Sequence, residues 1–148
     1  MRVAVCSDEP YAVHEVILAV LRERGHQILP FGSFASGGEQ PWAPAAEQAA
    51  LAVARGEADE GVFLCWTGTG ISIAANKIPG VRAALCGDPG TAAGARVWNH
   101  ANVLCLSNRT LSPDMAREIL AAWYDTEPGT RGEAGVGLLR EVEARHTR

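Results

Sequence analysis

Hydrophobic positions along the chain fall into two patterns: short apolar runs, and longer segments in which apolar residues recur every three or four positions. The short runs have the length and composition of buried strands, and they span residues 1–6, 26–31, 61–65, 82–86 and 102–106. Helical spacing characterises residues 13–21, 45–55, 72–77, 90–97 and 112–124. Strands that alternate with helices in this way predict an α/β fold, a three-layer α/β/α Rossmann-like sandwich with a five-stranded parallel sheet.

Two segments fit this pattern less clearly. Residues 32–44 are rich in Gly and Pro, and we expect a loop there. From residue 126 onward the periodicity weakens, although the apolar residues between 136 and 142 have the spacing of a short terminal helix. We expect a single domain, residues 1–148, in which the tail of about 126–148 packs on a partner subunit.

The composition indicates a globular protein that binds a small molecule. The 148 residues are 47% hydrophobic and 20% charged, with a net charge of −4, and no cluster of Lys or Arg is typical of nucleic-acid or membrane binding. The N-terminal residues contain no apolar stretch suited to a signal peptide, which predicts a cytoplasmic protein. Cys6, Cys65, Cys86 and Cys105 lie in or beside apolar runs without C-x-x-C spacing, so we expect reduced thiols and no metal site.

The segment 62–77 contains the strongest candidate for chemistry. A buried strand ends at Cys65, Gly68 and Gly70 allow a tight turn, and helical spacing then resumes. A thiol near a helix N-terminus has a lowered pKa and is a better base or nucleophile, and the N–H groups of such a turn favour an anionic ligand. Ile73 occupies the third glycine position of a dinucleotide motif, which argues against NAD binding. We predict that Cys65 is catalytic; the alternative is a buried strand residue.

Four separated blocks of sequence occur in a characteristic order. They are Ser7-Asp8 after the first strand, the loop Cys65-x-Thr67-Gly-Thr-Gly70, the run SIAANK-x-x-G-x-RAALC at residues 72–86, and ANVLCL at residues 101–106. In these blocks the chain resembles the ribose-5-phosphate isomerase B / galactose-6-phosphate isomerase (RpiB/LacAB) family. The resemblance implies a homodimer or homotetramer with shared active sites. It also implies aldose–ketose isomerisation of a sugar or sugar phosphate without a metal or organic cofactor.

The resemblance implies roles for individual residues. Cys65 corresponds to the base that moves a proton between C1 and C2 of the open-chain sugar, and Thr67 would steady its thiolate. Backbone N–H groups of Gly68, Thr69 and Gly70 would hold the developing enediolate oxygen. The other matches are Asp8 with an aspartate that contacts sugar hydroxyls, Asn99 with an asparagine that binds the enediolate region, and Arg109 and Arg131 with arginines associated with the phosphate.

Several of these residues also have a purely structural interpretation. Asp8 could simply cap the helix that follows it, and Asn99 is similarly ambiguous. Arg109 and Arg131 could be surface or interface ion-pair residues. His14 is expected on the surface of the first helix. The residues alone leave these alternatives open.

Three positions depart from the family pattern. Glu9 stands where family members usually have His, so a carboxylate replaces an imidazole near the phosphate. Trp98 replaces the His expected to open the sugar ring, which makes His100 the candidate for that role. Gly135 stands four residues after Arg131, where a second Arg is usual, so one anion clamp is missing.

Together these departures predict an isomerase with a changed substrate, a sugar or sugar phosphate other than ribose 5-phosphate. Trp66 and Trp98 would form an apolar or stacking wall beside the loop, and Glu9 is either a new base or a loop charge. One alternative is ribose-5-phosphate isomerase proper. Another is a non-catalytic sugar-binding protein or the partner subunit of a heteromeric isomerase. The retention of Cys65 favours an active enzyme, because degeneration usually removes the base first.

Overall fold

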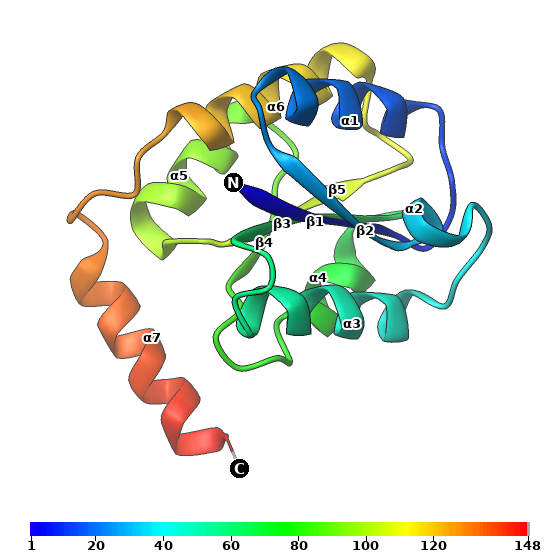
Figure 1. Ribbon diagram of the computed structural model, residues 1–148. Helices are drawn as coiled ribbons and strands as arrows, with labels where there is room; N and C mark the ends of the chain where they lie inside the picture. The colour runs from blue at the N-terminus through cyan, green and yellow to red at the C-terminus, as the bar shows by residue number, and fades with distance from the viewer. Residues whose placement is uncertain (148) are drawn as a thin grey trace.

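A parallel sheet forms the centre of the protein, whose computed structural model describes residues 1–147 (Figure 1). Its strands are β1 Arg2–Ser7, β2 Gln27–Gly32, β3 Glu60–Cys65, β4 Ala83–Leu85 and β5 Val103–Ser107. They lie in the order β2-β1-β3-β5-β4, and every neighbouring pair is parallel. The five-stranded parallel sheet expected from the sequence is confirmed.

Helices cover both faces of this sheet. In chain order the helices of the described residues are α1 Val13–Glu23, α2 Ser33–Ser36, α3 Trp42–Ala54, α4 Thr69–Ala75, α5 Pro89–Asn99, α6 Pro113–Asp125 and α7 Glu133–His146. The buried residues of α1, α5 and α6 form the core on one face, and those of α3 and α4 form the core on the other (Figure 1). The predicted three-layer sandwich is therefore confirmed. Within residues 1–147, no helix combines the length and apolar character needed to cross a membrane.

Side chains of the central strand β3 alternate between the two cores, as expected for a strand buried on both faces. Val62 and Leu64 pack with α1, α5 and α6. Phe63 and Cys65 pack in the core that α3 and α4 cover. Cys65, the last residue of β3, therefore lies on the same side of the sheet as α4, the next helix in the chain.

Two segments differ from the predictions. Residues 32–44, expected to be a loop, contain α2 and the start of α3 at Trp42. Gly37 ends α2 with a φ of 76°, the left-handed conformation common at helix ends. Helix α4 begins at Thr69, three residues before the expected start, because the left-handed Gly68 turns the chain directly into a helix.

The C-terminal helix α7 is longer than the short helix expected, and it extends away from the body of the protein (Figure 1). Val136 is the buried residue of this helix. Leu138, Leu139 and Val142 are 63%, 45% and 45% exposed. Most of the apolar surface of α7 is therefore uncovered in a single copy of the chain.

A buried ion pair joins the start of β3 to α5 and α6. Arg96 Nη1 lies 2.7 Å from Glu60 Oε2, and the two side chains are 11% and 9% exposed. The other carboxylate oxygen of Glu60 accepts a hydrogen bond from Trp123 Nε1 at 3.0 Å. Arg96 also donates to the backbone oxygen of Ala101 at 2.8 Å. These contacts fix the end of α5, and the turn that follows it, against the sheet.

We predict that Glu60→Ala lowers the free energy of unfolding by about 3–5 kcal/mol, because Arg96 is left as an uncompensated buried charge. Asp125→Ala is the matched control: it breaks the pair with Arg24, in which Asp125 is 66% exposed, and it should cost less than about 1 kcal/mol. Urea unfolding measures both. Equal losses in the two variants would contradict a special contribution from burial.

Candidate functional site

The carboxyl ends of β1, β3 and β5 meet at one edge of the sheet. Ser7 pairs with Leu64, so Asp8 comes next to Cys65, and Cys65 pairs with Ser107 on its other side. Ligands of open α/β sheets bind at this edge. The topology therefore brings together Asp8 and Cys65, which are far apart in the sequence.

Cys65 is almost fully buried at this edge, with 5% of its surface exposed. The other three thiols behave as core residues. Burial raises the pKa of Cys86 to about 11, and burial, with the nearby Asp8 and Cys65, raises the pKa of Cys6 to about 12. Burial also raises the pKa of Cys105. Cys65 alone among the four adjoins the glycine turn.

The turn after Cys65 requires glycine at position 68. Gly68 has a φ of 77°, and a Cβ atom there would lie 2.5 Å from Leu85 Cδ1 and 3.0 Å from Leu106 O. A larger residue would therefore clash as well as strain the backbone. The hydroxyls of Thr67 and Thr69 lie 2.6 Å apart, and Thr67 Oγ1 accepts from Thr69 N at 3.4 Å. The hydrogen bonds of Thr67 are thus with Thr69 and not with the Cys65 thiol that it was expected to steady.

A cavity of about 370 Å³ lies on one side of this turn, between the ends of β4 and β5 and helix α6. Its polar lining includes Thr67, Ser107, Arg109 and Thr110. Arg109 N donates to Trp66 O at 3.0 Å, which holds the exposed Arg109 beside the turn. This side of the edge carries a positive charge among hydroxyl groups, a setting suited to an anion.

The other side of the turn is acidic and aromatic. Burial raises the pKa of Asp8, and the carboxylates of Glu9 and Glu39 add to the rise. The Asp8 Oδ1 atom is buried without a hydrogen-bond partner in residues 1–147. Glu9 Oε2 accepts from the Tyr11 hydroxyl at 2.7 Å, which raises the pKa of Tyr11 to about 12. The Tyr11 ring stacks on Trp66 with centroids 5.7 Å apart.

Tyr11 was not among the residues selected from the sequence. Its hydroxyl and ring connect the predicted Glu9 to the predicted Trp66. The only sequence signal for it is an aromatic residue two positions after Glu9, in a turn that follows a strand. Gln40 was missed as well, although its N–H donates to Asp8 O at 2.7 Å, because its loop is distant in the sequence.

A second group of predicted residues lies at the opposite, amino edge of the sheet. We call Trp98, Asn99, His100 and Arg131 the amino-edge group. Helix α5 starts at the carboxyl edge and ends at Asn99, and β5 then starts at Val103. At about 3.3 Å per residue the strand separates the two edges by roughly 16 Å. The prediction that Trp98 lies beside the Cys65 loop is therefore wrong within one chain, because α5 carries it away.

Contacts within the amino-edge group are specific. The Arg131 guanidinium lies over the Trp98 ring, 4.6 Å from its centroid. His100 has a φ of 45° at the end of α5, and its backbone oxygen accepts from Arg82 Nε at 2.8 Å. The His100 Nε2 atom is buried without a partner among residues 1–147. In a single chain, none of these groups reaches Cys65.

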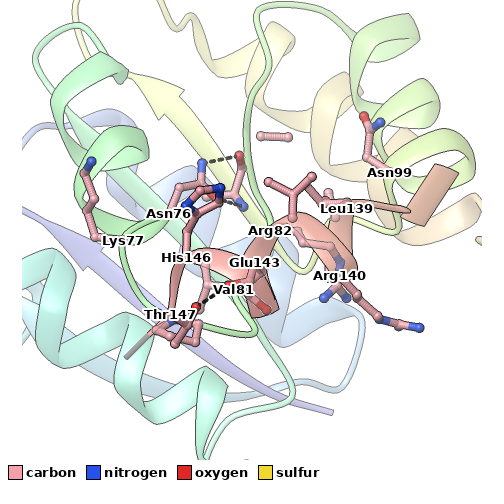
Figure 2. Close-up of a pocket in the computed structure, with 15 residues that line it drawn as sticks. Asn76, Lys77, Val81, Arg82, Asn99, Leu139, Arg140, Glu143, His146 and Thr147 are labelled. Atoms are coloured by element: carbon pink, nitrogen blue, oxygen red, sulfur yellow. Dashed lines mark hydrogen bonds between the residues drawn. The ribbon is translucent and has the colours of Figure 1, made fainter. Parts of the chain in front are cut away.

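A cavity of about 550 Å³ adjoins the amino-edge group. Asn99, Arg82 and Ala101 line it together with Leu139 and Glu143 of α7. Figure 2 shows side chains of α7 facing the segment around Arg82. The chain thus has one hollow beside the Cys65 turn and another at the far edge. Within the described part of the chain, no three His, Cys, Asp or Glu side chains are grouped to hold a metal ion.

Comparison with known proteins gives consistent matches. Residues 3–137 match the family described as Ribose/Galactose Isomerase. The chain is 37% identical to ribose-5-phosphate isomerase B of Escherichia coli, over 95% of this chain and 94% of the relative. It is 40% identical to D-erythrulose-4-phosphate isomerase of Pectobacterium atrosepticum, over 72% of this chain and 70% of the relative. Ribose-5-phosphate isomerase B of Clostridium thermocellum superposes with a TM-score of 0.91 at 36% identity, over 99% and 100% of the two chains.

A buried histidine lies behind the strand ends that lead to Asp8 and Cys65. His14, expected on a helix surface, is only 6% exposed, and its ring stacks on Phe34 with centroids 4.6 Å apart. The sequence contains a signal for this burial, because His14 precedes Ile17 by three residues and Leu21 by seven, on the same helix face. Burial lowers the pKa of His14, and its hydrogen bond to Asn108 opposes part of the shift.

This pKa predicts that the protein loses stability in mild acid. Below the unfolded-state pKa of about 6.5, the unfolded chain binds a proton at His14 that the folded chain resists, so the free energy of unfolding falls as the pH falls. His14→Leu should flatten this slope between pH 7 and pH 5 in urea unfolding. Burial also lowers the pKa of His26, so His26 contributes to the same pH dependence in the His14→Leu variant. His26→Gln removes that contribution. Parallel slopes for wild type and His14→Leu would contradict the prediction.

Proposed function

Because the chain belongs to the ribose/galactose isomerase family, we propose that it is an aldose–ketose isomerase that uses Cys65 as its base. The observation that supports this most strongly is the position of Cys65. It is a buried thiol at the carboxyl end of the central strand, directly before the turn that Gly68 makes into α4. A base there faces the edge at which such sheets bind ligands.

In the proposed reaction, the Cys65 thiolate removes the proton from C2 of the open-chain aldose and returns a proton to C1. The intermediate is an enediolate, whose oxygen carries the charge that develops. Backbone N–H groups of Gly68, Thr69 and Gly70 stabilise that oxygen. Asp8, on the neighbouring strand end, accepts hydrogen bonds from the sugar hydroxyls. While the Cys65 thiol holds the carbon-bound proton, that proton can exchange with solvent, and the hydroxyl proton on O2 moves to the oxygen on C1. No external oxidant or reductant is needed, because C1 is reduced as C2 is oxidised.

We propose that a second copy of the chain completes each site. Cys65 and Asp8 lie at one edge of the sheet, and the amino-edge group lies at the other. The proposed roles of Asn99 at the enediolate, of His100 in ring opening and of Arg131 at an anion require them to approach a thiol. Within one chain α5 keeps them apart. The uncovered apolar residues of α7, beside the cavity that Asn99 lines, offer a surface for that second copy.

The substrate that we propose is a sugar or sugar phosphate other than ribose 5-phosphate. On the acidic side of the edge, the Tyr11 hydroxyl holds Glu9 in position, and a carboxylate there repels a phosphate dianion. Arg109, on the far side of the turn, lines the neighbouring cavity and offers a cation to an anionic group. Trp66 is 52% exposed and offers a stacking surface at the mouth. These features support a substrate whose charged group lies toward Arg109.

We predict that Cys65→Ala strongly lowers the rate of proton exchange at C2. Solvent-deuterium incorporation into phosphorylated and unphosphorylated aldoses and ketoses should fall about 10²- to 10⁴-fold, the usual contribution of a general base. Cys105→Ala, which changes a fully buried thiol on the same core face, is the matched control and should retain exchange.

The same panel distinguishes the alternatives. Fastest exchange with a sugar other than ribose 5-phosphate supports the proposal, whereas ordinary turnover of ribose 5-phosphate identifies ribose-5-phosphate isomerase proper. If the wild type exchanges no sugar in the panel, the chain is a sugar-binding protein or the partner subunit of a heteromeric isomerase.

Shared sites predict complementation between two inactive variants. Cys65→Ala and Asn99→Ala should each be inactive alone. After unfolding and refolding as an equal mixture, they should recover about a quarter of wild-type activity, because half of the dimers are mixed and each mixed dimer has one intact site. If both residues acted within one chain, the mixture would stay inactive.

A further inference from the structure

A chain of buried hydrogen bonds lies at the carboxyl edge of the sheet, beside the ends of β1 and β5. His14 Nε2 is 2.8 Å from Asn108 Oδ1, and Asn108 Nδ2 donates to Ser7 Oγ at 3.2 Å. The Ser7 hydroxyl in turn donates to Glu9 O at 2.8 Å. The residues come from α1, from the end of β5 and from the end of β1, so the chain of bonds joins three elements that are distant in sequence.

These groups are nearly inaccessible to water. Ser7, His14 and Asn108 are 0%, 6% and 8% exposed. A buried polar group that loses its hydrogen-bond partner destabilises the fold by its full desolvation free energy. Breaking any one of these bonds is therefore unfavourable. The rings of Phe34 and Tyr11 contact the His14 imidazole, one stacked at 4.6 Å and one edge-on at 5.9 Å, and they hold its orientation.

The bonds have a defined direction. An amide oxygen only accepts, so His14 must donate from Nε2 to Asn108 Oδ1. The Asn108 NH2 group therefore faces Ser7, and the Ser7 hydroxyl donates its own hydrogen bond to Glu9 O. Without the imidazole N–H, the Asn108 amide would be free to turn over and present an oxygen to Ser7.

Asn108 also holds the strand that carries Cys65. Its backbone N–H donates to Cys65 O at 2.9 Å, while its side chain reaches Ser7, one residue before Asp8. A single residue therefore connects the strand end of the base to the turn that carries Asp8 and Glu9. The ladder between β1 and β3 ends at Ser7 and Leu64, so this turn lies beyond the reach of the sheet hydrogen bonds.

We propose that Asn108 is a positioning residue that sets Cys65 and the Asp8–Glu9 turn at their working separation, with His14 holding the Asn108 amide in the required orientation. This inference rests on the proposed roles of Cys65 and Asp8. Neither Asn108 nor His14 contacts the substrate. A displacement of about 1 Å in a reacting group lowers rates by as much as 10²-fold, so a loosened turn affects catalysis without removing any reacting atom.

The test compares Asn108→Ala and His14→Leu with wild type, using two measurements. The first is C2 proton exchange on the sugar that wild type processes fastest. The second is the rate of alkylation of each cysteine by iodoacetamide, resolved by peptide mass. Asp59→Ala is the control, because Asp59 makes hydrogen bonds of 2.7, 3.4 and 3.0 Å to Arg2 at the other edge of the sheet.

We expect both variants to lower kcat about tenfold to a hundredfold while alkylation of Cys65 accelerates and that of Cys6, Cys86 and Cys105 does not. Both variants keep the backbone hydrogen bond from residue 108 to Cys65 O, so the thiol is uncovered by the loosened Asp8–Glu9 turn. The double variant should be no slower than the worse single variant, because the two residues act as one unit. Asp59→Ala should keep wild-type exchange and alkylation.

Other outcomes overturn the inference. Equal acceleration at all four cysteines means general destabilisation, and unchanged kcat with unchanged Cys65 alkylation means that the bonds serve packing alone. If the losses of kcat in the two single variants add up in the double variant, His14 and Asn108 act independently. If wild type itself exchanges no sugar, the proposed function fails, yet selective alkylation of Cys65 in the variants still tests the positioning.

Discussion

The pairing of β3 between β1 and β5 is the constraint on which the rest of the protein depends. Parallel pairing makes the three strands end at one edge, and each ending places a different group there: Asp8 from β1, Cys65 from β3 and Asn108 from β5. The tight turn into α4 needs Gly68, because a Cβ atom at that position would clash with Leu85. The grouping of these residues at one edge is thus a consequence of strand order together with one glycine.

The charges around this edge are divided by the Cys65 turn. Acidic groups and stacked aromatic rings lie on the β1 side, and Arg109 lies among hydroxyl groups on the β5 side. For the proposed isomerase, a substrate with one charged end would fit both sides in only one orientation, with its anion toward Arg109. In the proposed isomerase, the orientation of the substrate would follow from the electrostatics of the same edge that carries Cys65.

The strands, the family and the isomerase class were accessible from the sequence. The structure confirms the strands, and the comparisons confirm the family and the isomerase class. Short apolar runs predict buried strands from local sequence. The residues of the Cys65 turn are also contiguous in the chain, so the sequence shows them together. Trp98 was placed beside that turn, which is wrong within one chain, because family motifs do not show at which edge of the sheet α5 ends. Helix α2 was missed because Gly and Pro suggested a loop, and His14 because a polar residue suggests a surface even where its spacing matches Ile17.

By itself, the sequence determined what is local: which segments form strands and helices, where the chain must turn, and which thiol adjoins that turn. Only the tertiary structure decided which residues meet. It put Tyr11 against Trp66, linked His14 to Asn108 across 94 residues, and, within one chain, placed the amino-edge group away from Cys65. The physical reason is that hydrogen bonds, stacking and charge act through short distances in space, and strand order, which periodicity does not encode, sets those distances.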